Sequence, residues 1–281
     1  MTWAFDLTTH ILLAVLLAGT LVGIGRGVRI RRGLRKRLAV DPGQRVVFYR
    51  RTIIAGWTTA AFVPLVAFTS GELSATDLGW RWPNGDGIDY LLAAYLVTVI
   101  GIGGLRSRRR MRRGVTSAVR AGTAPIVPRT GHERRWAAVV ALTAGVTEEM
   151  IYRGLFIAAG TRLYHLPLAL VVIASLALFV GMHAYQGRAG MIAVAVLGGL
   201  FTILYLISGS LLLVIVVHIW QDVVALLLIP AYPSVLATRE GAITQSPTDD
   251  ADQARTESAA TTDHEAAPQP PRSVLRSSVP T

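Results

Sequence analysis

Several ionisable side chains stand in otherwise apolar segments of this 281-residue sequence, namely Glu148, Glu149, Arg153, His183, His218 and Asp222. A charged side chain at the centre of a membrane span costs roughly 2.5 to 3.5 kcal/mol on insertion scales. Such side chains are therefore expected to be paired with another group or to serve the protein's function. Carboxylates and imidazoles together can activate water and stabilise an oxyanion, which is the chemistry of a hydrolase.

Helical spacing separates the two glutamates. Glu149 and Arg153 are four residues apart, so they share a helix face and are expected to form a structural ion pair. Glu148 points about 100° away from that face and is not covered by the same arginine. The spacing therefore predicts that Glu148 is the free carboxylate, in the role of general base or acid.

The histidines also have neighbours at helical spacing. Asp222 follows His218 by four residues, and we expect it to accept a hydrogen bond from one imidazole nitrogen and so fix the tautomer. Phe179 precedes His183 by four residues, and its ring is expected to wall one side of that histidine. Taken singly, each polar group also has a structural interpretation, but three separate spans carry one.

The composition indicates a membrane protein. Hydrophobic residues make up 52% of the chain, charged residues only 16%, and the mean hydropathy is +0.47. A span needs about 20 mostly apolar residues. The apolar runs predict an all-α, polytopic transmembrane helix bundle with about seven spans, at 9–25, 52–70, 88–105, 136–158, 167–185, 190–207 and 211–229.

Charge orients these spans. Most of the arginine falls in 26–51 and 106–135, which should both be cytoplasmic, whereas the 71–87 and 159–166 loops hold little positive charge. The segment 236–281 is rich in Pro, Ser, Thr, Asp and Glu, and is expected to be a disordered, cytoplasmic C-terminal tail.

Three regions follow from this pattern. We expect N-terminal helices with basic cytoplasmic loops at 1–135, a helix bundle with the polar motif residues at 136–230, and the tail at 236–281.

The chain contains no cysteine, which excludes disulfides and thiolate chemistry. The net charge of +11 is explained by topology and by a bilayer with anionic headgroups, so no nucleic acid is expected as a partner.

Three motifs in order on late helices resemble a known family. The segments "EEMIYR", "FVGMH" at 179–183 and "HIWQD" at 218–222 fit E-E-x-x-x-R, F-x-x-x-H and H-x-x-x-[ND]. They resemble the CPBP family of CAAX-prenyl endopeptidases and bacteriocin-processing enzymes, also called the Abi family. The resemblance implies that Glu148 activates water with the help of His183, and that His218 and residue 222 line an oxyanion site.

The expected function is therefore an intramembrane endopeptidase in a multi-pass cell-membrane protein, acting on a membrane-associated protein or peptide. The alternatives are a proton-coupled membrane carrier and a non-catalytic membrane scaffold or immunity protein. No cofactor is favoured, since Arg153 is expected to occupy Glu149, but zinc held by Glu148, His183 and His218 remains an alternative on residue types. The aspartate at 222, where many members have asparagine, leaves its own role open, and the oligomeric state is not determined.

Overall fold

All regular structure in the described part of the chain is helical. The computed structural model describes residues 2–83, 85, 87–115 and 117–229. The tail predicted at 236–281 lies outside these residues. The elements are α1 Thr2–Val40, α2 Gln44–Ala60, α3 Phe62–Ser70, α4 Ile88–Arg112, α5 Ala118–Thr123, η1 Ala124–Ile126, α6 Gly131–Glu149, η2 Met150–Leu155, α7 Phe156–Ala158, η3 Ala159–Leu163, α8 Leu168–Met182, η4 His183–Gln186, α9 Gly187–Ser208, α10 Leu211–Val223 and η5 Val224–Leu228.

The helices account for about seven membrane crossings, as the apolar runs predict. Five stretches are long and apolar enough to span a bilayer: Leu7–Gly27, Gln44–Ser70, Ile88–Arg112, Leu168–Ser208 and Leu211–Leu228. The fourth stretch contains two helices, α8 and α9. A further long helix, from α6 through η3, carries the charged motif at 148–153 within an apolar sequence. The protein is thus a multi-pass membrane protein.

α8 and α9 form an antiparallel hairpin around the short segment η4. Gly187, with φ of 79°, begins the return of the chain. Further along α9, a Cβ added at Gly198 would come within 3.1 Å of the side chains of Leu176 and Phe179 on α8. This close packing shows that α9 runs back along α8, because Gly198, after η4, contacts Leu176 and Phe179, before it.

Local sequence sets several helix boundaries. Thr130 and Glu133 form a capping box at the start of α6, in which each side chain accepts from the other residue's backbone N–H. Pro64 lies in the first turn of α3, where its missing N–H is tolerated, and α2 ends just before it. Pro167 precedes α8, and Gly71 ends α3 in the left-handed conformation.

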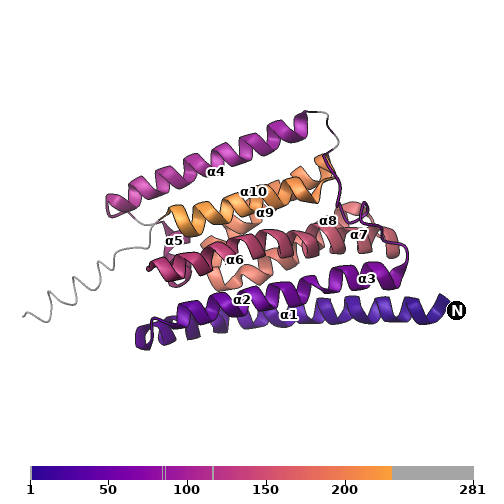
Figure 1. Ribbon diagram of the computed structural model, residues 1–281, viewed down its shortest axis with the longest axis horizontal. Helices are drawn as coiled ribbons and strands as arrows, with labels where there is room; N and C mark the ends of the chain where they lie inside the picture. The colour runs from indigo at the N-terminus through magenta and orange to yellow at the C-terminus, as the bar shows by residue number, and fades with distance from the viewer. Residues whose placement is uncertain (1, 84, 86, 116, 230–281) are drawn as a thin grey trace, which may run out of the picture. The chain divides into compact units, whose positions relative to one another are not determined.

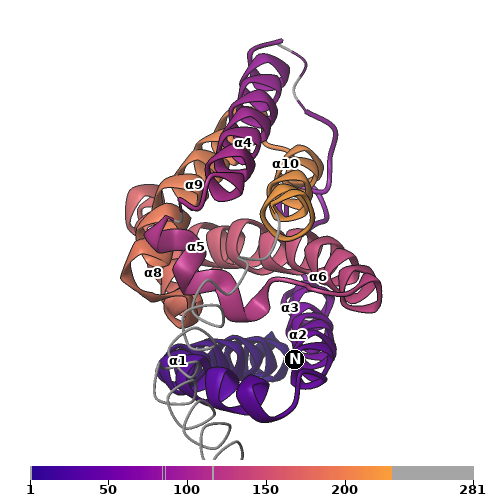
Figure 2. The same ribbon diagram turned by 90° about the vertical axis from the view of Figure 1, so that its left-hand side faces the viewer.

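The helix from α6 through η3 is central to the bundle. Figure 2 shows α6 between α1, α2 and α3 on one side and α4, α9 and α10 on the other. α6 packs against both α2 and α10. Leu155 in η2 is fully buried within the core that α1 and α3 form, and Ile157 in α7 joins the core of α4, α9 and α10. The motif at 148–153 is therefore enclosed by helices from the whole chain.

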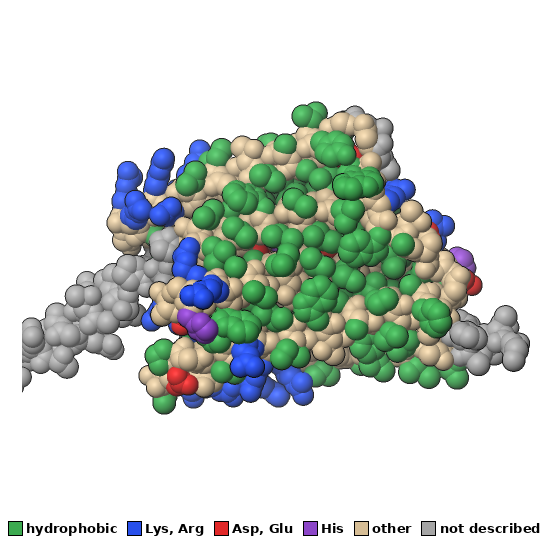
Figure 3. Space-filling view, viewed as in Figure 1, with side chains coloured by type: hydrophobic (Ala, Val, Ile, Leu, Met, Phe, Trp, Pro, Cys, Tyr) green, Lys and Arg blue, Asp and Glu red, His purple; other side chains and the backbone are tan. Residues whose placement is uncertain are grey.

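Basic side chains gather at one end of the bundle, which we call the arginine-rich end. Figure 3 shows them at the left, beside a broad apolar surface over the middle of this face. In Figure 1 the same end holds the α1–α2 connection and the end of α4. Glu133 of α6 binds Arg45 of α2 there, with Nη1 of the arginine 2.7 Å from Oε1. That this end faces the cytoplasm remains a prediction from the arginine distribution.

Candidate active site

Three motif residues lie at or near a change of helix type. Glu149 is the last residue of α6, and the π-helical segment η2 begins at Met150. His183 opens the 3₁₀ segment η4 directly after α8. Asp222 lies two residues before the π-helical segment η5. Departures from α-helical hydrogen bonding frequently mark functional sites, because they reorient side chains and release backbone groups.

Glu149 and Arg153 form the ion pair that their spacing predicts. Nη1 of Arg153 lies 2.9 Å from Oε1 of Glu149, and both side chains are almost completely buried. The remaining guanidinium groups donate to α9, from Nη2 to the carbonyl of Gly198 at 2.9 Å and from Nε to the hydroxyl of Thr202 at 3.3 Å. The guanidinium also lies 4.3 Å from the centroid of the Phe179 ring. Arg153 thereby joins η2 to α8 and α9.

Glu149 has a second partner that the sequence analysis missed. Nδ1 of His218 lies 2.6 Å from Oε1 of Glu149. The prediction that Asp222 fixes the His218 ring is wrong, because the nearest carboxylate oxygen of Asp222 is 3.9 Å from Nε2 and makes no hydrogen bond with it. Since a carboxylate paired with arginine accepts only, Nδ1 of His218 is the donor and Glu149 sets the orientation of the ring.

His183 is held in the same manner through the backbone. Its Nδ1 lies 2.8 Å from the carbonyl oxygen of Phe179, which can only accept, so Nδ1 carries the proton. The Phe179 ring lies 4.7 Å from the His183 ring, as expected, and the Tyr185 ring also stacks on His183, with ring centroids 5.9 Å apart and an interplanar angle of 30°. Both histidines therefore use Nδ1 for a fixed contact, and Nε2 is left for chemistry.

Glu148 is the point on which the two histidines converge. Its Oε2 is 3.8 Å from Nε2 of His183 and 3.9 Å from Nε2 of His218. These separations are too long for direct hydrogen bonds and suit contact through one shared oxygen atom. Within the described residues, no group donates a hydrogen bond to this buried Oε2 atom. The structure thus brings together Glu148, His183 and His218, with Asp222 beside them.

A metal was the alternative explanation for this set of residues. Within residues 2–229, apart from 84, 86 and 116, no group of three or more His, Cys, Asp or Glu side chains could hold a metal ion. Nδ1 of each histidine is held by Glu149 or Phe179 and Nε2 is free, an orientation that metal-ligating histidines share, so the ring contacts alone do not decide between water and zinc. Chelation tests the metal dependence directly.

Several supporting residues had no signal in the sequence. Thr202 and Gly198 contact Arg153 from α9, and the Phe201 ring lies 5.4 Å from that of His218. Tyr185 falls outside every motif. These residues are ordinary components of apolar helices by type, and the packing of α9 and η4 against α8 and of α9 against α10 brings them to the site.

Comparison with known proteins agrees with the motifs. Residues 132–224 match the family model described as Type II CAAX prenyl endopeptidase Rce1-like. This region is about a third of the chain and contains every motif residue discussed above. No curated protein matches the chain. No solved structure matches it. Region 132–224, with its EExxxR, FxxxH and HxxxD motifs, is similar to the CPBP family of CAAX-type membrane endopeptidases.

Proposed function

We propose that this protein is an intramembrane endopeptidase that hydrolyses a peptide bond in a membrane-associated protein or peptide, using water activated by Glu148 and His183. The observation that carries the proposal is the position of Glu148 Oε2, which lies 3.8 Å and 3.9 Å from the Nε2 atoms of two histidines on different helices. The family match over 132–224 supports the same reaction class.

The proposal gives each group a task. A water between Glu148 and His183 donates one proton to Oε2 and a hydrogen bond to the lone pair of Nε2, because the proton of His183 resides on Nδ1. The oxygen of this water attacks the carbonyl carbon of the peptide bond. Glu148 then passes its proton to the leaving amide nitrogen as the C–N bond breaks, so the products are an amine and a carboxylic acid, and the acid releases its remaining proton to water.

His218 stabilises the oxyanion formed by that attack. As an imidazolium it donates from both nitrogens, from Nδ1 to Glu149 at 2.6 Å and from Nε2 to the oxyanion. Arg153 neutralises Glu149, so the charge of that carboxylate is balanced before substrate arrives. Asp222 flanks Nε2, and its charge opposes an oxyanion unless it is neutral or turned away.

The test is cleavage of a fluorescence-quenched membrane peptide by the purified full-length protein. Glu148→Gln keeps the size of the side chain but cannot take a proton, so turnover should fall by about 10³-fold or more. Glu72→Gln, at an exposed site in the loop after α3, is the matched control and should retain full turnover. Turnover by Glu148→Gln equal to that of the wild type would refute the proposal, and the carrier and scaffold alternatives predict no cleavage by any form.

Two further experiments test the substrate class and the dependence on metal. Peptides with and without a prenylated cysteine, compared at equal concentration, show whether the CAAX substrate class of the matched family extends to this chain. Exhaustive chelation followed by zinc addition separates the mechanisms, because the water mechanism predicts unchanged turnover and a metal mechanism predicts loss and recovery.

A further inference from the structure

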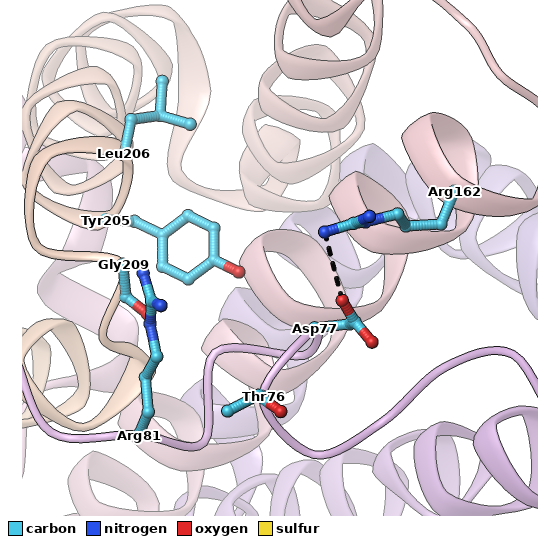
Figure 4. A pocket seen from close by; sticks show the side chains of 7 residues that line it. All are labelled: Thr76, Asp77, Arg81, Arg162, Tyr205, Leu206 and Gly209. Atoms are coloured by element: carbon cyan, nitrogen blue, oxygen red, sulfur yellow. Dashed lines mark hydrogen bonds and ion pairs between the residues drawn. The ribbon is translucent and has the colours of Figure 1, made fainter.

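A pocket of about 280 Å³ opens at the end of the bundle opposite the arginine-rich end. It is lined by Thr76, Asp77, Arg81, Arg162, Tyr205, Leu206 and Gly209. Figure 4 shows the Tyr205 hydroxyl directed toward the Arg162–Asp77 pair, with the Arg81 side chain beside Gly209. These residues come from the loop before α4, from η3, from the end of α9 and from the α9–α10 turn, so the pocket lies apart from the site around Glu148.

The loop that forms one wall is fastened to the α9–α10 turn. The Leu211 N–H donates to the carbonyl of Gly79 at 2.8 Å, and the Ser210 hydroxyl donates to the carbonyl of Arg81 at 2.7 Å. Nε of Arg81 donates to the carbonyl of Gly209 at 2.9 Å. Gly209 has φ of 59°, and any Cβ there would collide with the Arg81 guanidinium. The pocket is therefore built before a ligand arrives, which reduces the ordering cost of binding.

The charges of this pocket favour a monoanion. Arg81 and Arg162 contribute two positive charges, and Asp77 contributes one negative charge, 3.2 Å from Nη2 of Arg162. The hydroxyl and N–H of Ser74 hydrogen-bond to Asp77 and lower the pKa of its carboxyl, so it stays ionised. The balance is one positive charge beside a phenol, and a phosphodiester carries the matching single negative charge.

An apolar track leads from the pocket along α9. Exposed side chains at helical spacing lie on one face of this helix: Ile192 at 67%, Val196 at 59%, Ile203 at 50% and Leu206 at 44% exposure. Gly199 falls between them with no atom within 4 Å of an added Cβ, which leaves the face flat. Leu206 lies 14 residues after Ile192, a rise of about 21 Å along the helix, which is most of the thickness of a hydrocarbon core.

The surroundings place the pocket at a membrane–water interface. Trp82, next to Arg81, is 80% exposed, and tryptophan is enriched at the level of lipid headgroups. Leu206 belongs to both the pocket and the apolar track. A soluble anion would use the arginines and leave the track unused, whereas a phospholipid would use both.

We propose that this pocket binds the phosphodiester group of a phospholipid between Arg81, Arg162 and Tyr205, with an acyl chain along the α9 face from Leu206 to Ile192. The Asp77–Arg162 contact holds the second guanidinium at the wall of the pocket. The lipid is a bound ligand of the fold, and it takes no part in the chemistry at Glu148.

The experiment measures lipid binding to the delipidated full-length protein in detergent by native mass spectrometry. Phosphatidylglycerol should bind the wild type, and Arg81→Gln and Arg162→Gln should each weaken it roughly ten-fold, the loss expected for one charge-assisted hydrogen bond. Arg108→Gln, an exposed arginine at the other end of the bundle, is the matched control and should bind like the wild type.

Two competitors identify the part of the ligand that is recognised. Diacylglycerol with the same acyl chains lacks the phosphate and should not compete, and glycerophosphoglycerol keeps the phosphodiester but lacks the acyl chains, so it should compete only at far higher concentration. Phosphatidylglycerol binding unchanged in both arginine variants would overturn the proposal, as would glycerophosphoglycerol binding as tightly as the lipid. The Arg162 side chain is 67% exposed, so its variant folds and decides the question should Arg81→Gln lower the yield.

Discussion

Nδ1 of His218 lies 2.6 Å from Oε1 of Glu149, the same oxygen that receives Nη1 of Arg153 at 2.9 Å. One carboxylate oxygen thus links α6, η2 and α10. This arrangement makes Glu149 a positioning residue for His218 as well as the partner of a buried arginine. Glu148, one residue earlier, remains free of both contacts because it points to a different side of the helix.

Replacement of Glu149 tests this dual role. Glu149→Gln removes the charge that compensates buried Arg153, and the loss of one partner of a buried pair should lower the free energy of unfolding by about 3 to 5 kcal/mol. The measurement is thermal unfolding in detergent beside Glu72→Gln, which should melt like the wild type. Turnover of the folded fraction should also fall with KM nearly unchanged, because His218 loses its fixed acceptor. Wild-type turnover per folded molecule would leave Glu149 with a purely structural role.

Helical spacing predicted the contacts made within one helix. The Glu149–Arg153 pair and the Phe179–His183 contact are both four residues apart, and both are present. Glu149 and His218 are 69 residues apart, so no local pattern could indicate their hydrogen bond. The same packing of α10 against α6 explains why Asp222 was wrongly expected to hold the His218 ring.

The crossing helices were predictable for a physical reason. A bilayer demands long apolar helices, so apolar runs mark them directly. The π-helical turns after Glu149 and Asp222 were not predictable, because they depend on which carbonyls neighbouring helices satisfy. Helix α1 also continues through the basic segment after the first span, which apolar runs alone do not show.

The two histidines should act as a unit. His183→Ala removes the acceptor that orients the water, and His218→Ala removes the donor to the oxyanion, so each should lower kcat/KM by roughly 10² to 10⁴-fold. The double variant should lose far less than the product of the two, because neither group works without the other. His132→Ala, at an exposed site in the first turn of α6, should retain wild-type kinetics. Multiplicative losses would mean that the two rings serve independent steps.

Asp222 should tolerate loss of its charge. Its Oδ2 lies 3.9 Å from Nε2 of His218, near the position assigned to the oxyanion. Asp222→Asn keeps the shape and removes a repelling charge, so kcat/KM should change by less than about ten-fold or rise. The measurement is the peptide cleavage assay over a range of pH values. A loss as large as that of Glu148→Gln would instead make the ionised aspartate an essential participant.

Acid should weaken the contact between α2 and α6 at the arginine-rich end. Burial raises the pKa of Glu133, but the Arg129 N–H and the charge and hydrogen bond of Arg45 outweigh it, and the pKa falls below its ordinary value of 4.5. Because the folded pKa is depressed, the stabilisation is present above pH 4.5 and is lost as the pH falls through the folded value. The free energy of unfolding of Glu133→Gln should therefore be lower than that of the wild type at pH 7, by about 1 to 3 kcal/mol. This difference in stability should narrow below pH 4.5. Thermal unfolding of both forms from pH 7 to pH 3 measures this difference, with Glu72→Gln as control. A stability difference that stays constant across the range would show that the charge of the Glu133 carboxylate does not cause it.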